Sequence, residues 1–431
     1  MWDAIRSNKR KSFWLIVFMA LILSALGGAI GSYLFSHNPQ DGIFMGVLVA
    51  MIVWIIMLLV SFSSGDRILL ATAGAHEIKH DDAPQLFNIV EEMKIASGLP
   101  KMPRVFIIDS SVPNAFAVGI SKDRAAVAVT TGLMSRLNRD ELQGVIAHEI
   151  SHISNRDTYF MTLAGVTVGA VIILADLFLR GMWYSSLTGG RRSSRDSGQL
   201  QLIIMIVSII LAILAPILTQ LLYFACSRQR EYLADAGAAQ ITRYPEGLAS
   251  ALHKISSSQS ENFSKSRTLA PMYIVNPLAA QGKSNSLFST HPSTEDRIRI
   301  LRGMSANASL KAYEQSFQNI HGGKSILGKT SLQDSRDQSI RSAQDVKHDS
   351  KKNMRDVKDI LHKAAGYGLL TCTCGVKMKI PKDTDYSKVK CPRCGITHNI
   401  PIEFLSAAAI ALSEREKGSV NQDQKIQIKE S

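Results

Sequence analysis

The stretch that decides the fold of this 431-residue chain is Ala147-His148-Glu149-Ile150-Ser151-His152. Upstream of it, Asn138 with Glu141 three positions later predicts a helix N-terminus with a capping box. The apolar residues between the two features recur at helical spacing: Leu142, Val145, Ile146 and Ile150. On such a helix His148 and His152 project side by side, one turn apart. Two imidazoles so placed can hold one zinc ion, and Glu149 can then accept a proton from water.

A hydrolytic zinc site of this type needs a third protein ligand and one open position. Glu231 is the best candidate for that ligand, and Asp235 lies one turn further along the same helix face. Asp235 and Asp157 are placed to orient the ligating imidazoles from behind. The alternative interpretation is that these carboxylates form helix-surface ion pairs with Arg228 or Arg230.

Composition indicates an anionic neighbour and no disulfide scaffold. The chain carries a formal net charge of +13, which suits a membrane surface or a nucleic acid. Its hydrophobic fraction of 46% is ordinary, but the apolar residues are concentrated in long runs. The five cysteines do not indicate a disulfide scaffold, because four of them lie in one short C-terminal stretch.

Two apolar runs, Phe13–Phe35 and Ile43–Phe62, predict an N-terminal hairpin of transmembrane helices. Basic residues lie in 1–12, and the turn between the runs has none. The positive-inside rule therefore places the N-terminus and the chain after Phe62 in the cytoplasm. A cleaved signal peptide is the alternative, but its apolar region is shorter and no second run follows it.

Two further apolar runs, Tyr159–Leu179 and Leu202–Ala225, predict a second hairpin at a length that matches a bilayer. A helical hairpin buried in a soluble core is the other interpretation. The loop between the runs contains Arg180, Arg191, Arg192 and Arg195. If both runs span the membrane, this basic loop lies outside and conflicts with the positive-inside rule. Either two crossings or none leaves His148 and Glu231 on the same side.

The remaining segments predict a small α+β domain around the motif helix. A helix is expected from Asp82 to about Ser97, and strands at Arg104–Asp109, Asn114–Val118 and Ala125–Thr130. The predicted domains are 1–64, a transmembrane hairpin; 65–157 and 227–321, two parts of one metalloprotease domain; 158–226, the second hairpin; 322–365, a charged linker; and 366–431, a cysteine-rich tail.

The tail contains Cys372-Thr373-Cys374-Gly375 and Cys391-Pro392-Arg393-Cys394-Gly395. Paired cysteines with a glycine after the second, separated by a hairpin-length spacer, predict a zinc ribbon. Four thiolates complete the coordination of the ion, so this zinc would be structural. Free surface cysteines are the alternative, and His398 is interpreted as a bystander.

The motifs together resemble one family. They are Pro113–Gly119, the run from His148 to Asp157, the segment from Ser227 to Asp235, and Phe288–Pro292 with Arg297. The chain resembles the HtpX family of membrane zinc metalloproteases, which are related to the CAAX prenyl endopeptidases. The resemblance covers residues 1 to 302, and the linker and tail over 322–431 are not generally part of that family.

The resemblance implies a mainly α membrane protein with transmembrane helices and an α+β gluzincin-type protease domain. To these the cysteine-rich tail of this chain adds the predicted zinc ribbon. It implies a multi-pass enzyme of the inner (cytoplasmic) membrane whose catalytic domain faces the cytoplasm. Its partners would be the lipid bilayer and damaged or misassembled membrane proteins. Asn114, Ala115 and Phe116 match an edge strand that pairs with substrate backbone. His291 matches a histidine that stabilises the oxyanion near the active site.

The sequence therefore predicts a zinc endopeptidase with one catalytic zinc on His148, His152 and Glu231, and one structural zinc on the four tail cysteines. Glu149 would act as the general base and His291 would assist it. Two alternatives stay open: a proteolytically inactive membrane adaptor, and a nucleic-acid-binding protein that acts through its ribbon. The tail lacks a dense basic stripe interleaved with aromatic residues, so no nucleic acid is expected, and the oligomeric state is left open.

Overall fold

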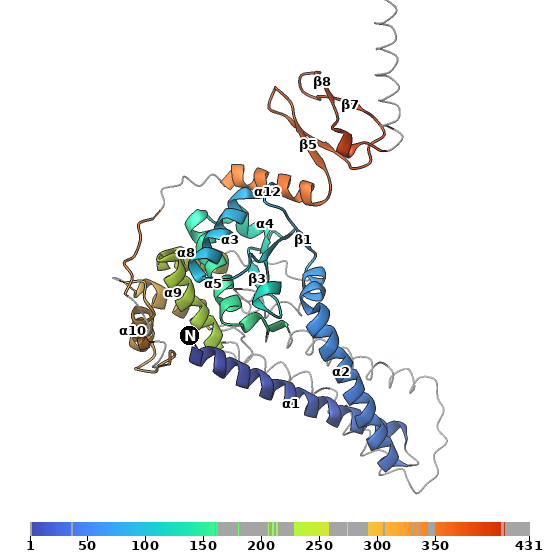
Figure 1. Cartoon of the computed structure of the whole chain (residues 1–431), viewed down its shortest axis with the longest axis vertical. Helices are drawn as coiled ribbons and strands as arrows, with labels where there is room; N and C mark the ends of the chain where they lie inside the picture. The colour runs from blue at the N-terminus through green and yellow to red at the C-terminus, as the bar shows by residue number, and fades with distance from the viewer. Residues whose placement is uncertain are drawn as a thin grey trace, which may run out of the picture. The chain divides into compact units, whose positions relative to one another are not determined.

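The computed structural model describes residues 2–35, 38–159, 161–162, 180, 206, 209–210, 213, 228–257, 274, 292–304, 307–328, 332–333, 337–343, 350–406 and 409. The chain forms two compact units, shown in Figure 1. Unit 1 comprises 1–75 and 85–348, and unit 2 comprises 76–84 and 349–431. Most of the predicted second hairpin, 158–226, lies outside the described residues, and so does His291.

A hairpin of two long helices begins unit 1: α1 (Trp2–Leu34) and α2 (Pro39–Thr72). Facing glycines allow their backbones to approach closely. A Cβ added at Gly27 would lie 2.5 Å from both the Gly46 carbonyl oxygen and the Ala50 Cβ, and Gly31 meets the Gly42 carbonyl in the same way. Among the described helices, α2 is long and apolar enough to cross a membrane, while α1 contains a shorter apolar stretch, Ile16–Ser32.

Helix α2 continues beyond the predicted end of the hairpin at residue 64, because its last turns belong to the soluble core. Leu69 and Leu70 are buried in one cluster with sheet residues such as Phe106 and Phe116. Just before them, Asp66 is 1% exposed and accepts a hydrogen bond of 2.8 Å from the Arg104 guanidinium. Apolar packing and this ion pair thus fasten the apolar helix to the sheet.

The sheet contains all three predicted strands, in the order β2-β4-β3. The elements here are β1 (Ala75–Glu77), α3 (Pro84–Ser97), β2 (Arg104–Ile108), β3 (Ala115–Val118), η1 (Lys122–Arg124), β4 (Ala126–Thr130) and α4 (Thr131–Arg136). Strands β2 and β4 are parallel, with Arg104 opposite Ala126. Strands β3 and β4 are antiparallel, with Ala115 opposite Val129. Strand β3 therefore lies at one edge of the sheet, as the sequence predicted for residues 114–116.

The motif helix is α5 (Arg139–Ser154), and its predicted capping box is confirmed. The Asn138 side chain accepts from the Glu141 backbone N–H, and the Glu141 carboxylate accepts from the Asn138 backbone N–H, each at 2.9 Å. From Asp140 to Ser154 every residue of α5 is buried. The helix contacts β3 and β4, and it also packs on α8 (Pro245–Ser257), where Gly144 lies against the backbone of Leu248.

Besides α8, three further helices of unit 1 lie after the motif helix in the sequence. Residues 228–242 form a helix, here called the Glu231 helix, which is followed in sequence by α8, α9 (Thr294–Arg302) and α10 (Leu310–Ile320). The α10 residue Ser316 donates a hydrogen bond of 2.7 Å to the Ile300 carbonyl of α9. Phe317 of α10 packs edge-on against Tyr232, with ring centroids 5.0 Å apart. Helix α10 thus supports both α9 and the Glu231 helix.

Unit 2 contains a helix and two small hairpins. Its elements are α12 (Ser350–Ala364), β5 (Gly368–Thr371), β6 (Lys377–Ile380), β7 (Lys388–Lys390), β8 (Thr397–Asn399) and η4 (Ile402–Phe404). Strand β5 pairs antiparallel with β6, and β7 pairs antiparallel with β8. Helix α12 lies in the segment predicted as a linker; it buries Val357 and Ile360 and contacts β5. The chain as described is mostly helical with a small sheet, which confirms that part of the predicted fold class.

Candidate metal centre and active site

Two helices bring the predicted ligands His148, His152 and Glu231 together. Their candidate ligand atoms all lie within 4.8 Å of one another. The two histidine Nε2 atoms are 3.2 Å apart, and each lies 3.5 Å from an oxygen of the Glu231 carboxylate. All three side chains are buried. Two imidazoles and one carboxylate are the donor set that zinc takes in many hydrolytic sites.

A carboxylate lies behind each histidine ring, as the sequence predicted. Asp235 Oδ1 is 2.9 Å from His148 Nδ1, and Asp157 Oδ2 is 3.0 Å from His152 Nδ1. With Nδ1 facing a carboxylate, each ring turns its Nε2 atom toward Glu231. Burial alone would lower the pKa of both histidines, but the carboxylates around them raise both pKa values. The surroundings therefore favour positive charge between the rings, which fits a divalent cation.

Arg297 completes the site, and no role for it was predicted from the residues. Its side chain is fully buried at the start of α9 and donates to both oxygens of Asp235, at 2.8 and 2.7 Å. Burial alone would raise the pKa of Asp235, but the Arg297 guanidinium lowers it, so Asp235 is held as a carboxylate. Arg297 also lies 3.4 Å from Glu231. In the sequence, Arg297 stood out only as part of a motif with Pro292. That motif does not reveal that Arg297 pairs with Asp235.

Glu149 follows His148 on α5 and is 2% exposed. Burial raises the pKa of its carboxyl group, although the positive charges of His148, His152 and Arg297 act in the opposite direction. A carboxylate with a raised pKa holds a proton more readily than one in water, which suits a group that must accept a proton and then release it.

The predicted substrate-binding residues lie where β3 begins. Asn114 is buried; its backbone carbonyl accepts from the Thr130 N–H at 3.0 Å, and its side chain accepts from the Ala115 N–H at 3.1 Å. On the other side of β3, the Ala115 carbonyl accepts a hydrogen bond of 3.2 Å from the Ile274 N–H. The Ile274 carbonyl in turn accepts from Arg297 at 2.9 Å. The backbone of Ile274 therefore lies beside this edge strand and connects it to Arg297 by hydrogen bonds.

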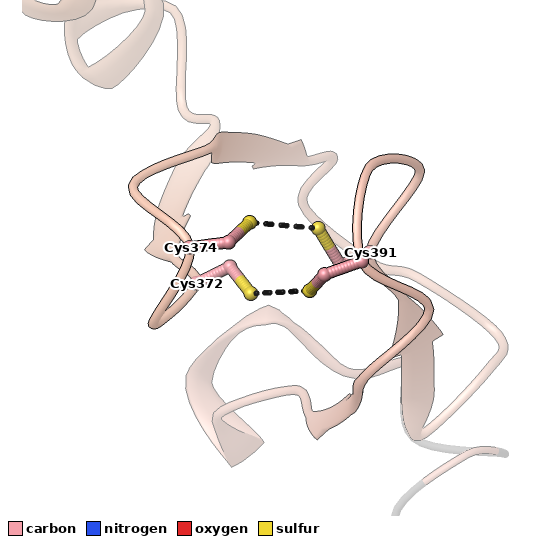
Figure 2. Close-up of side chains that lie close together, drawn as sticks. Cys372, Cys374 and Cys391 are labelled. Atoms are coloured by element: carbon pink, nitrogen blue, oxygen red, sulfur yellow. Dashed lines mark hydrogen bonds between the residues drawn. The ribbon is translucent and has the colours of Figure 1, made fainter.

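The four tail cysteines converge in unit 2, as Figure 2 shows. Cys372 Sγ lies 3.4 Å from Cys394 Sγ, and Cys374 Sγ lies 3.6 Å from Cys391 Sγ. All four thiols are free, and these separations are far longer than a disulfide bond of about 2.05 Å. They are close to the sulfur–sulfur spacing of about 3.8 Å that four Zn–S bonds of about 2.3 Å give in a tetrahedron.

Two similar turns position these thiols. Gly375 and Gly395, the residues after each cysteine pair, have φ values of +83° and +75°, which favour glycine. The Gly375 N–H donates to the Cys372 carbonyl at 2.8 Å, and the Gly395 N–H donates to the Cys391 carbonyl at 3.0 Å. A backbone N–H at Cys374 lowers the pKa of the Cys372 thiol to about 5, which favours the metal-binding thiolate form.

This fold and this site define a metallopeptidase. The profile described as Peptidase family M48 matches residues 80–305, and the chain belongs to that family. The match includes both histidines, Glu149, Glu231 and Arg297, and it ends before α10 and the cysteine tail.

Curated relatives carry the name Protease HtpX homolog. The chain is 46% identical over 304 residues to that of Dictyoglomus thermophilum, covering 70% of this chain and 94% of the relative. It is 42% identical over 304 residues to that of Thermoanaerobacter pseudethanolicus, covering 70% and 98%. It is 41% identical over 308 residues to that of Lactobacillus helveticus, covering 70% and 100%. The solved structure of S. mikatae Ste24p is similar with a TM-score of 0.38 and 17% identity, over 70% of this chain and 67% of that one.

Proposed function

We propose that this metalloprotease cleaves peptide bonds of damaged or misassembled membrane proteins, with His148, His152 and Glu231 as its zinc ligands. The observation that carries the proposal is the convergence of these three buried side chains from two helices within 4.8 Å. Family membership and the HtpX relatives support the class of reaction. The choice of substrate is the part of the proposal that follows the resemblance to the HtpX family.

When bound, the zinc ion supplies Lewis-acid chemistry: it lowers the pKa of water and polarises the peptide carbonyl. Glu149 accepts the proton of the attacking water and passes it to the leaving amine nitrogen. Asp235 and Asp157 keep each imidazole in the orientation that presents Nε2. Arg297 holds Asp235 ionised and excludes water from that side. His291 is the proposed donor to the developing oxyanion.

For substrate binding we propose strand addition to the edge of β3 at Asn114, Ala115 and Phe116. The position of β3 at the end of the strand order supports this, since among the described residues no strand pairs with its other side. The contact between Ala115 and Ile274 supports it further, because a backbone N–H from elsewhere in the chain already hydrogen-bonds there. A substrate that binds at Ala115 would replace Ile274 at that carbonyl.

The location we propose is the inner membrane, crossed more than once, with the protease domain in the cytoplasm. The length and apolar character of α2 support insertion. So do large apolar side chains that are exposed on the helical hairpin, among them Trp14, Phe44, Ile55 and Leu59. The basic residues of the N-terminal 12 positions support the orientation.

For unit 2 we propose a structural zinc held by Cys372, Cys374, Cys391 and Cys394, within a domain that docks substrates or partners. The convergence of the four thiols and the two glycine turns support the metal site. With the peptidase site this gives two zinc ions per chain.

The proposal is tested by Glu149→Gln in the full chain, purified in detergent. We expect this variant to keep its zinc and to lose cleavage of a membrane-protein substrate by about 10²- to 10⁴-fold, because the amide cannot accept the proton. Glu91→Gln, at an exposed position of α3, is the matched control and should cleave normally. Undiminished cleavage by Glu149→Gln, with zinc retained, would refute the mechanism.

A further inference from the structure

The two helices that carry the proposed zinc ligands touch each other close to the site. Gly237 of the Glu231 helix faces Ser151 of α5, and a Cβ added at Gly237 would lie 2.6 Å from the Ser151 hydroxyl. At this contact the helices are as close as a glycine allows. Their separation at Glu231 therefore depends on the angle between them, and contacts further along both helices contribute to that angle.

Such a contact exists at the far ends of the two helices. It is made by residues 337–343, here called the strap. The strap residue Arg341 donates from Nη2 to the Asp140 carboxylate at 2.7 Å and to the Gln143 side-chain oxygen at 2.6 Å, both on α5. Its Nε donates to the Thr242 carbonyl, at the end of the Glu231 helix, at 3.1 Å. One guanidinium group therefore joins both ligand-bearing helices.

Arg341 contacts both helices at some distance from the proposed zinc ligands, so a small change there can shift Glu231 relative to the histidines. Asp140 precedes His148 by eight residues, and Thr242 follows Glu231 by eleven. At a rise of about 1.5 Å per residue, these are arms of about 12 and 16 Å. Because a packed helix behaves as a rigid rod, a small change at the Arg341 end alters the position of Glu231 relative to the two histidines.

The strap has anchors besides Arg341. The Ser339 carbonyl and hydroxyl accept from the Arg243 side chain at 3.2 and 3.1 Å. The Gln338 carbonyl accepts from the Ala308 N–H, and the Gln338 N–H donates to the Asn307 side chain, each at 2.9 Å. Loss of the Arg341 side chain therefore leaves these anchors of the strap in place. It removes the link between the helices, together with the packing of the guanidinium on the Tyr244 ring and its hydrogen bond to the Ser342 carbonyl.

We propose that Arg341 is a positioning residue of the peptidase: by joining Asp140 of α5 to the Thr242 carbonyl, it holds Glu231 at ligand distance from His148 and His152. The proposal rests on the zinc ligands assigned under Proposed function. Arg341 lies beyond residue 305, where the match to the family model ends.

The experiment compares Arg341→Ala and Arg341→Lys with the unaltered full chain in detergent. Zinc affinity and the visible spectrum of bound Co²⁺ are measured in a background with Cys391→Ser and Cys394→Ser, so that thiolate ligation does not contribute. Cleavage of a soluble reporter peptide is measured with the cysteines intact. The matched control is Arg302→Ala, because Arg302 makes a similar carboxylate contact at the surface, with Glu246 of α8.

We expect Arg341→Ala to bind zinc about tenfold more weakly, at the lower end of the effect of groups that orient metal ligands. Its Co²⁺ spectrum should change, and kcat should fall more than KM rises. Arg341→Lys should be intermediate, because an ammonium group can pair with Asp140 but cannot also reach across to Thr242. Arg302→Ala should keep the unaltered zinc affinity and spectrum.

An Arg341→Ala variant with the zinc affinity and Co²⁺ spectrum of the unaltered chain would overturn the proposal, even if its unfolding temperature were lower. Zinc affinity lost equally in Arg341→Ala and Arg302→Ala would also overturn it, since general destabilisation would then be the cause. Failure of the proposed function is recognised separately: His148→Ala in the same background would then bind zinc as tightly as the parent.

Discussion

The histidine–carboxylate site of unit 1 and the cysteine site of unit 2 are built in opposite ways. The first draws its proposed ligands from helices that are far apart in the sequence, and His148, His152 and Glu231 are all less than 5% exposed. The second draws all four ligands from two turns within residues 372–394, and Cys394 is exposed. Carboxylates and a buried arginine surround the first site, whereas backbone N–H groups and glycine turns support the second.

The difference indicates how far the fold of each region depends on its metal ion. The peptidase ligands are positioned by a large packed core, so we expect that fold to exist without metal and to be able to present an open position for water. The cysteine turns lie in a unit whose described apolar clusters are small, such as that of Ile380, Ile400 and Leu405. A domain of this kind takes much of its folding free energy from the metal.

The largest effect is expected when a ligand is removed from the first site. Glu231→Ala should release one zinc ion per chain and lower cleavage by at least about 1000-fold, because the ion contributes several kcal/mol of transition-state stabilisation. Metal analysis with a peptidase assay measures both. Glu246→Ala, at a surface carboxylate, is the control. Retention of full metal content by Glu231→Ala would show that Glu231 is not a zinc ligand, and the comparison of the two sites would then lose its basis.

Removal of a ligand from the second site should instead unfold its surroundings. Structural zinc contributes about 10–16 kcal/mol in small zinc domains, so Cys391→Ser should abolish amide protection in β5 to β8, as measured by hydrogen exchange. Cleavage of a soluble peptide should stay within about twofold, since the two sites belong to separate compact units and share no ligand residue. His398→Ala is the control and should keep the metal. A tail that stays protected without zinc would contradict the comparison.

The smallest of the three effects concerns the carboxylates that exist only at the first site. Asp157→Asn keeps the shape of the side chain but weakens its hold on His152 Nδ1, so zinc should bind about tenfold more weakly at the peptidase site. Zinc at the cysteine site should be unaffected. Competition with a chelator measures both, and Asp123→Asn, at an exposed position, is the control. Equal weakening at both sites would argue against a local cause.

Local patterns predicted the elements well where a short-range physical rule applies. The capping box at Asn138 marked the start of α5 because its hydrogen bonds join residues three apart. The three strands were identified from apolar β-branched runs and lie within a residue or two of their predicted ends. The apolar run that predicted α2 stops at Phe62, whereas the helix continues to Thr72, where Leu69 and Leu70 pack against a sheet that lies later in the chain.

The sequence by itself determined the chemistry: two imidazoles one turn apart, a neighbouring carboxylate, and paired cysteines followed by glycine. These depend on spacing along one helix or one turn, where covalent geometry dictates distance. Only the tertiary structure decided how Arg297 meets Asp235, how Ile274 lies beside β3, and how Arg341 links two helix ends. Such contacts join residues that are tens or hundreds of positions apart, and their distances follow from the packing of the whole core rather than from any local rule.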